Sequence, residues 1–348
     1  MHPLLQVKDI ECRYRNQTVI NRLSLHVNRG SLVCLLGSSG CGKTTVLRAI
    51  AGFEPVYHGK ITMENTLLSK PGFREPPERR KLGMVFQDYA LFPHMNIFQN
   101  VSFGLRDKSS SYKKQTVERL LSLVGMDGFE KRFPHEMSGG QQQRIALARA
   151  LAAQPEIILM DEPFSNLDVE LRERLSIEIK DILKKEGITG ILVTHHQDEA
   201  FALSDQIGVM HEGKILQWDT PANIYHEPAN RFVADFIGQG VFLNGTMLEP
   251  DCLETEFGML KGDRAYKWSK GEQVELLIRP DDVVYDPESA IQGEIVQKAF
   301  KGAEILYTLT LPTGGKVLSL FSSHHDHAIG EKVGISLNMP HVVAFPVS

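Results

Sequence analysis

The sequence predicts an α/β protein followed by a smaller all-β domain, and two patterns support this. Short, nearly all-apolar runs are typical of parallel strands buried on both faces, and helical patterns separate them. These runs are residues 32–37, 157–161 and 190–195. After residue 240 the pattern changes to short strand-like runs between Pro and Gly turns, as in a small β-barrel or sandwich. We therefore predict one domain over 1–238 and a second over 239–348.

The composition excludes several classes of protein. With 348 residues, the chain is long enough for two domains of roughly 150 residues each. A net charge of −5 gives no bulk attraction to nucleic acid phosphates, and no apolar run reaches the ~18 residues of a membrane span. The first residues lack the apolar core of an export signal, and the four scattered cysteines show neither disulfide nor zinc-ligand spacing. We expect a cytoplasmic protein that binds no nucleic acid.

A phosphate-binding motif follows the first apolar run and precedes a predicted helix, Thr45 to Ala51. The motif G-x-x-x-x-G-K-[S/T] consists of Gly37, Ser38, Ser39, Gly40, Cys41, Gly42, Lys43 and Thr44. Its glycines let backbone N–H groups converge on phosphate oxygens, and the helix N-terminus adds a favourable dipole. We expect Lys43 to reach the β- and γ-phosphates and the Thr44 hydroxyl to hold Mg²⁺. The motif predicts a nucleoside triphosphate site.

Two acidic residues, Asp161 and Glu162, follow the second apolar run. A carboxylate at the end of a central strand can hold the Mg²⁺ shell, which suits Asp161. Glu162 can then face the γ-phosphate and polarise an attacking water. An acidic pair at a strand end is by itself often a solvated turn, but the phosphate loop upstream favours the chemical interpretation.

A second phosphate-binding surface is predicted upstream of Asp161, in the run MSGGQQQR. Ser138 can cap a helix that starts near Gln141, which leaves free N–H groups and a glycine pair at its positive end. Two such surfaces bind one phosphate tail only if they face each other, most simply across two subunits. In isolation, the same residues would be better explained as an ordinary capped helix.

At these motifs the chain resembles the ATPase subunits of ABC transporters, over residues 1 to about 235. SGGQQQR matches the signature of that family, although Met137 replaces the usual Leu. The resemblance implies a P-loop ABC ATPase domain with a helical subdomain at about 88–155, ATP and Mg²⁺ as cofactors, and a head-to-tail homodimer. In that dimer one subunit's phosphate loop faces signature residues of the other, namely Ser138, Gly139, Gly140 and Gln141.

The resemblance also assigns roles to single residues. Tyr14 would stack on adenine, although a strand-edge core tyrosine is an open alternative. Gln87 would reach Mg²⁺ and the attacking water, and His195 would contact the γ-phosphate. His196 stands where the family usually has Asp. The implied catalytic set is Glu162, His195 and Gln87, and the implied Mg²⁺ ligands are Thr44, Gln87 and Asp161.

Such a subunit acts on a separate permease, and residues 88–106 are the predicted contact. This stretch is rich in apolar and aromatic residues, part of which would form the helical subdomain's own core. The rest would line a groove for a cytoplasmic helix of the permease. We expect a peripheral protein at the cytoplasmic face of the cell (inner) membrane, served indirectly by a periplasmic or extracellular solute-binding protein.

The C-terminal segment bears on the transported solute. The run Leu277 to Asp282 (LIRPDD) resembles the IRPE element of the small, OB-like regulatory β-domain of importer ATPases. Together with the junction FIGQGVF, it most resembles the ferric-iron (Fe³⁺) importer subunits. Polyamine, sugar, phosphate ester, sulfate and molybdate import remain alternatives, because the solute never touches this chain. A non-catalytic regulatory ATP-binding module is an alternative of another class.

Two further clusters are interpreted as surface loops. His324, His325 and His327 could ligate a metal, but adjacent histidines in a polar turn are more often solvated, so we assign no site to them. The short basic run ERRK, 78–81, is likewise predicted to be a solvated loop.

Overall fold

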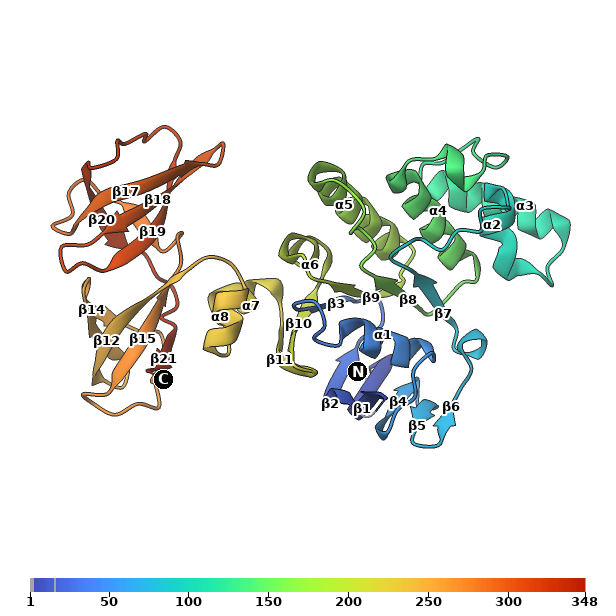
Figure 1. The fold of residues 1–348 in the computed structure, drawn as a ribbon, viewed down its shortest axis with the longest axis horizontal. Helices are drawn as coiled ribbons and strands as arrows, with labels where there is room; N and C mark the ends of the chain where they lie inside the picture. Colours follow the sequence, from blue (N-terminus) through green and yellow to red (C-terminus); the bar gives the residue numbers. More distant parts are fainter. Residues whose placement is uncertain (1–2, 16, 348) are drawn as a thin grey trace. The chain divides into compact units, whose positions relative to one another are not determined.

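The computed structural model describes residues 3–15 and 17–347 and divides into two compact units, Met1–Pro221 and Ala222–Ser348 (Figure 1). The first is an α/β unit that carries the phosphate loop and a group of inserted helices, and the second is an all-β, barrel-like unit. The predicted fold class is confirmed.

A mainly parallel sheet forms the centre of the first unit, and it positions the predicted site. Within the described residues its order is β11-β10-β3-β9-β8-β7. These strands are β3 (Leu32–Leu36), β7 (Leu82–Val85), β8 (Ile157–Asp161), β9 (Thr189–Thr194), β10 (Gln206–His211) and the antiparallel edge strand β11 (Lys214–Asp219). Every residue of β3, β8 and β9 is buried, which is the reason for their continuous apolar runs. Because parallel strands end at one edge of the sheet, the segments that follow β3, β8 and β9 meet there.

An antiparallel sheet with the order β2-β1-β4-β5-β6 packs against the same core. Its strands are β1 (Leu5–Tyr14), β2 (Gln17–Val27), β4 (His58–Met63), β5 (Thr66–Lys70) and β6 (Phe73–Arg74). Ile10 and Ile20 of this sheet share one buried cluster with Leu35 of β3 and Leu47 of helix α1 (Lys43–Ala51). Burial of these side chains away from water is the main driving force for this packing.

The basic run 78–81 was predicted to be a solvated loop, and for Arg80 this is wrong. Its side chain is fully buried and makes five hydrogen bonds. The guanidinium donates to the carbonyls of Ala49 (3.0 Å) and Ile50 (2.7 Å), at the end of α1, where helix carbonyls lack the usual donor four residues further on. It also donates to Leu68 O (3.0 Å), Ser69 Oγ (2.8 Å) and Glu75 O (2.8 Å). Arg80 therefore ties α1 to β5.

The inserted helices lie between β7 and β8. They are α2 (Ile97–Ser102), α3 (Ser110–Leu123) and α4 (Gly139–Ala152). After β8 follow α5 (Val169–Lys185) and α6 (Gln197–Leu203). Asp168 caps α5 by accepting a hydrogen bond from Leu171 N (2.9 Å), as its residue type favours. Leu175 and Ile179 of α5 are buried, whereas Ile177 is 55% exposed.

Helices α7 (Pro221–His226) and α8 (Arg231–Phe236) belong with the second unit. Ala234 packs with Leu277, Val343 and Phe345, and Arg231 pairs with Glu275 of β15. Residues 222–238 therefore lie with the C-terminal unit, whereas we predicted them in the nucleotide-binding domain. Their short helical pattern resembles that of the preceding α/β region, so the sequence alone did not show this packing.

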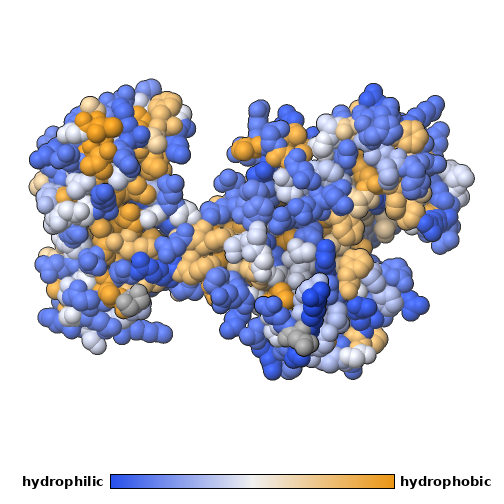
Figure 2. Space-filling model, in the orientation of Figure 1, coloured by the Kyte–Doolittle hydropathy of each residue, from blue (hydrophilic) through white to orange (hydrophobic). Residues whose placement is uncertain are grey.

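Two sheets enclose the core of the second unit. Their orders, for the residues that the structure describes, are β14-β13-β12-β15-β21 and β16-β20-β17-β18-β19. The strands are β12 (Val241–Glu249), β13 (Cys252–Thr255), β14 (Gly258–Lys261), β15 (Gln273–Ile278), β16 (Val283–Tyr285), β17 (Gln292–Phe300), β18 (Glu304–Thr310), β19 (Lys316–Ser322), β20 (Lys332–Leu337) and β21 (Ala344–Pro346). Alternate residues such as Ile305, Tyr307 and Leu309 point into one apolar cluster. On the face drawn in Figure 2, hydrophilic residues cover most of the surface of each unit, and smaller apolar areas lie among these hydrophilic residues.

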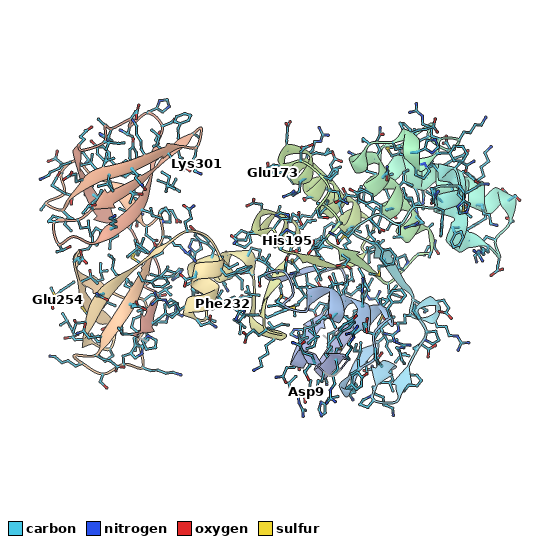
Figure 3. All side chains as sticks on the ribbon, viewed as in Figure 1. Asp9, Glu173, His195, Phe232, Glu254 and Lys301 are labelled. Atoms are coloured by element: carbon cyan, nitrogen blue, oxygen red, sulfur yellow. The ribbon has the colours of Figure 1, made fainter. Side chains whose placement is uncertain are left out.

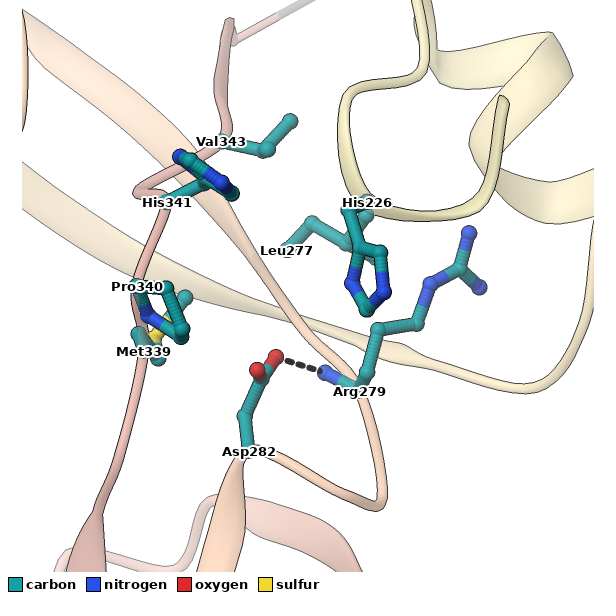
Figure 4. A pocket seen from close by; sticks show the side chains of 8 residues that line it. All are labelled: His226, Leu277, Arg279, Asp282, Met339, Pro340, His341 and Val343. Atoms are coloured by element: carbon teal, nitrogen blue, oxygen red, sulfur yellow. Dashed lines mark hydrogen bonds between the residues drawn. The ribbon is translucent and has the colours of Figure 1, made fainter. Parts of the chain in front are cut away.

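The second unit should respond to pH through Asp282, which lines a small cavity beside Arg279 (Figure 4). Its carboxylate accepts a hydrogen bond from Arg279 N (2.7 Å), but burial raises its pKa from 3.8 to about 6. An aspartate with a raised folded-state pKa stabilises the fold when protonated, so this contribution is full below about pH 4 and is lost as the pH rises through 6.

Replacement Asp282→Asn removes this ionisation. We expect the variant to be more stable than the native chain at pH 7.5, by on the order of 1 kcal/mol, and no more stable at pH 4. Thermal unfolding of the C-terminal unit at both pH values measures this. Glu254→Gln, at an exposed position of β13 (Figure 3), is the matched control. An equal change at both pH values would contradict the assignment to ionisation.

Candidate nucleotide site

The phosphate loop follows β3 and encloses a buried lysine. Gly40 and Gly42 have φ values of 81° and 106°, which residues with a side chain rarely adopt. The Lys43 ammonium, in a side chain only 4% exposed, donates to the carbonyls of Gly37 (2.7 Å) and Ser38 (2.9 Å). A cavity of about 210 Å³ lies over the loop. It is lined by Val19, Ser39, Gly40, Gly42, Lys43, Thr44, Thr45 and Glu162.

Asp161 lies next to the phosphate loop, as predicted from its place at the end of β8. The Thr44 hydroxyl donates a hydrogen bond to Asp161 Oδ1 (2.9 Å). Burial raises the pKa of Asp161, while the bond from Thr44 and the positive charge of Arg48 oppose this shift. Asp161 also lines a second cavity of about 500 Å³, together with Gln87 and Asn166. The Asn166 amide donates to Gln87 O (3.1 Å), so the loops that carry these two residues are joined.

Glu162 has a backbone conformation that is unusual for a residue with a side chain. Its φ is 44°, and this is held by Glu162 N donating to Val193 O (3.0 Å) and by Ser165 Oγ donating to Glu162 O (3.0 Å). Strained backbone of this kind persists where the surroundings impose it, often at functional sites. Here it accompanies a carboxylate that lines the phosphate-loop cavity.

His195 meets Glu162 at this edge of the sheet. Strands β8 and β9 are parallel neighbours, with Asp161 opposite Val193. His195, labelled in Figure 3, follows the end of β9, and its Nδ1 lies 3.3 Å from Glu162 Oε1. One chain thus brings together Lys43, Thr44, Asp161, Glu162 and His195, with Gln87 on the adjoining cavity.

The signature residues lie apart from that group. Ser138 caps α4 in a reciprocal pair with Gln141, and the helix starts at Gly139, slightly earlier than predicted. The two glycines allow close packing on the same chain, since an added Cβ would lie 3.3 Å from Leu167 at Gly139 and 3.1 Å from Leu171 at Gly140. None of the described residues that line the two cavities belongs to 138–141. Within one chain, therefore, the signature does not complete the phosphate site.

Tyr14 ends β1 and is 67% exposed, with the Arg15 guanidinium 5.8 Å from its ring centre. The open alternative of a buried core tyrosine is therefore wrong. An exposed aromatic ring is free to stack on a planar ligand, and the adenine contact stays a prediction.

The histidine cluster at 324–327 forms contacts within the C-terminal unit. His327 Nδ1 lies 2.7 Å from Glu331 Oε1, and its ring stacks with that of His325 at 6.5 Å between centroids. Over 3–15 and 17–347, no group of three or more His, Cys, Asp or Glu is arranged to hold a metal ion. We assign this cluster no ligand.

The sequence analysis missed several charged residues around the site. Arg149 of α4 donates to the carbonyls of Tyr89 (2.7 Å) and Ala90 (2.5 Å), and so holds the loop after Gln87. Arg172 lies 3.5 Å from the buried Glu199 and 3.3 Å from His196, the residue after His195. No spacing in the sequence distinguishes these residues from ordinary charges on a helix surface. Only the fold shows that their partners are backbone carbonyls and buried side chains.

In the part of the chain that the structure describes, no helix has the length and apolar character that crossing a bilayer requires.

Comparison with known proteins identifies the family. The family model described as ABC transporter matches residues 20–165, and the one described as TOBE domain matches 276–345. The Spermidine/putrescine import ATP-binding protein PotA of Clostridioides difficile is 40% identical over 96% of this chain and 95% of its own length. The protein of the same name from Clostridium acetobutylicum is 39% identical over 96% and 94%.

A solved structure is also similar. This is cbiO1 from Clostridium perfringens, described as part of the ABC transporter complex cbiONQ, with a TM-score of 0.61 and 26% identity. The match covers 66% of this chain and 93% of that one. The chain therefore belongs to the ATP-binding subunits of ABC transporters, with a TOBE domain in its C-terminal unit.

Proposed function

We propose that this chain hydrolyses ATP to energise an ABC importer, with Glu162 as the group that polarises the attacking water. The convergence of the phosphate loop, Asp161, Glu162 and His195 at one sheet edge carries this proposal. A non-catalytic regulatory module is the weaker alternative, because it would tolerate a degraded site. Here the lysine, the acids and the histidine are all present and in reach of one another.

The geometry suggests how each group acts. The loop N–H groups and the Lys43 ammonium would bind the phosphate oxygens and stabilise the charge that develops during transfer. Glu162 would accept the proton of the attacking water, and His195 would hold the Glu162 carboxylate in place through their 3.3 Å contact. Tyr14 would stack on the adenine ring.

The residues also fit Mg²⁺. The Thr44 hydroxyl and an Asp161 carboxylate oxygen lie 2.9 Å apart, and Gln87 lines the cavity that Asp161 also lines. Oxygen donors of this kind are the ligands that Mg²⁺ prefers. Mg²⁺ bound there would neutralise charge on the phosphates. Thr44, Asp161 and Gln87 would hold it.

We further propose a head-to-tail homodimer, because the signature residues do not line the phosphate site of their own chain. In such a dimer the free N–H groups at the start of α4 would face the phosphates bound by the partner. Each nucleotide would then lie between two subunits, and hydrolysis would let them separate.

A mixing experiment tests the shared site. Lys43→Ala removes the phosphate-loop cation, and Ser138→Arg places a bulky side chain at the signature. We expect each variant alone to be at least about tenfold less active than the native chain. An equimolar mixture forms some dimers with one intact composite site, so activity should return to roughly a quarter of native. A mixture as inactive as its components would contradict shared sites.

The permease would dock on the inserted helices. Ile97 and Val101 are fully buried in the helical region, whereas Leu91, Phe92 and Phe98 are only half-buried. These half-buried side chains offer an apolar surface next to the loop that carries Gln87. Through this contact the chain would sit peripherally at the cytoplasmic face of the membrane, with a solute-binding protein acting on the permease from the other side.

For the solute we propose a polyamine. The sequence analysis predicted ferric iron, but the relatives compared above are named for spermidine/putrescine import, which favours the polyamine alternative. The comparisons give no support to iron. In the proposed mechanism the solute does not touch this chain, so the choice rests on these relatives alone.

Uptake by cells that lack this chain tests the solute. We expect loss of labelled spermidine and putrescine uptake and no change in ferric iron uptake. The measurement is the initial rate for each solute, with sugar and phosphate ester uptake as further controls. Loss of iron uptake with normal polyamine uptake would restore the original prediction and contradict the present one.

A further inference from the structure

Arg172 of α5 joins three parts of the first unit through its guanidinium. Nη2 donates to Leu167 O (3.0 Å), Nη1 lies 3.3 Å from His196 Nδ1, and Nε lies 3.5 Å from Glu199 Oε1. The side chain is 17% exposed, and that of Glu199 is 1% exposed. Arg172 does not line either cavity of the candidate site.

Its partners are linked to each other. The Thr194 hydroxyl donates to Glu199 Oε2 (2.5 Å) and accepts from His196 N (3.0 Å). Arg172, Glu199, Thr194 and His196 therefore form a closed ring of contacts. Leu167, the remaining partner, belongs to the loop that begins just after Glu162.

This cycle of contacts is close enough to the proposed catalytic groups to orient them. The imidazole rings of His196 and His195 lie 4.0 Å apart between centroids, and His195 contacts Glu162. Because Arg172 can only donate, His196 Nδ1 must be an acceptor, which places the proton of a neutral ring on Nε2. Loss of Arg172 would leave the buried Glu199 carboxylate without its cation and both loops without their common partner.

We propose that Arg172 is a positioning residue, which fixes the loop after Glu162 and the His195–His196 turn in the arrangement needed for hydrolysis. This inference rests on the proposed function, since it assumes that Glu162 and His195 act on ATP. It assigns a task to a side chain outside the phosphate site.

The contact with His196 also makes this arrangement sensitive to pH. The groups that face His196 are Arg172 of α5, the neighbouring His195, Glu162 after β8, and Asp198 and Glu199 of α6. Burial, then the charges of His195 and Arg172, hold the pKa of His196 below its usual value, and the acidic groups act in the opposite direction. A proton on His196 would remove the acceptor and set two cations side by side.

Steady-state hydrolysis by the full chain tests the role of Arg172. We expect Arg172→Gln to lower kcat about tenfold to a hundredfold and to leave KM for ATP within about twofold, because only positioning is lost. Arg174→Gln is the matched control, since Arg174 is exposed on the same helix and lies 3.9 Å from Glu178. An unchanged kcat for Arg172→Gln, or a change in KM alone, would overturn the proposal.

The pH profile separates positioning from a general loss of structure. His196→Asp keeps an acceptor for Arg172 that stays ionised at lower pH. The fall of kcat on the acid side of its pH profile should therefore move to lower pH. In a chain that already carries Arg172→Gln, adding His196→Asp should leave the acid side of the profile unchanged. An identical acid limb for the native chain and His196→Asp would overturn the proposal, even if Arg172→Gln does not fold.

The same assays distinguish this inference from the proposed function. If Glu162→Gln abolishes hydrolysis while Arg172→Gln is as active as native, the proposed function stands and the positioning role is wrong. If native hydrolysis does not depend on Glu162, the proposed function itself fails, and the role of Arg172 fails with it.

Discussion

Replacement of Glu162 by glutamine is expected to lower the rate of ATP hydrolysis about 100-fold or more. Glu162 lines the phosphate-loop cavity. Glutamine keeps the size of the side chain and can still bond to His195, but it cannot accept the proton of the attacking water. The Kd for ATP should change only a few-fold, because Lys43 and the loop N–H groups remain.

Two measurements on the full chain check this prediction. Phosphate release gives the rate, and titration calorimetry with ATP gives the affinity. Glu173→Gln is the control, since this glutamate is exposed on α5, away from both cavities (Figure 3). A Glu162→Gln chain that hydrolyses ATP at half the native rate would show that another group polarises the water.

Replacement of Arg80 by methionine is expected to destabilise the first unit by about 3–5 kcal/mol. Arg80 is fully buried, and burial lowers its pKa only to about 10, so it is charged at neutral pH. Methionine fills similar space but removes all five hydrogen bonds of the guanidinium, including that to Ile50 O at the end of α1. The phosphate loop leads directly into α1, so ATP binding should weaken as the unit loses stability.

Denaturant unfolding of the full chain, followed in its first unit, measures the effect. Arg79→Met is the matched control, because the neighbouring Arg79 side chain is 73% exposed and its ion pair with Glu75 spans 4.0 Å. That variant should differ from native by less than about 0.5 kcal/mol. Equal unfolding midpoints for the two variants would contradict a structural role for Arg80.

The sheet and the heart of the site were predictable from the sequence for one physical reason. Strands buried on both faces are apolar throughout, so 157–161 and 190–195 stood out as β8 and β9. Residues directly after parallel strands meet at one edge, which favoured a place for Asp161 near the phosphate loop. His195 was assigned there by the resemblance to ABC transporter ATPases. The capped start of α4 followed equally from Ser138 and Gln141.

Other features depend on contacts that a sequence does not display. Arg80 looked like part of a solvated run, and only the fold shows that carbonyls of α1 and β5 converge on it. Arg172 likewise resembles any charged residue of an amphipathic helix until Leu167 and His196 are placed beside it. The solute could not be predicted for a different reason, namely that the proposed mechanism gives it no contact with this chain.

Spermidine uptake by cells that lack this chain, supplied with either the native chain or Glu162→Gln, tests the central claim most directly. The account predicts that the native chain restores uptake and that the variant does not, although both are present in equal amounts and bind ATP. Equal restoration by both chains would show that import does not depend on hydrolysis at Glu162, and restoration by neither would show that this chain does not serve spermidine import.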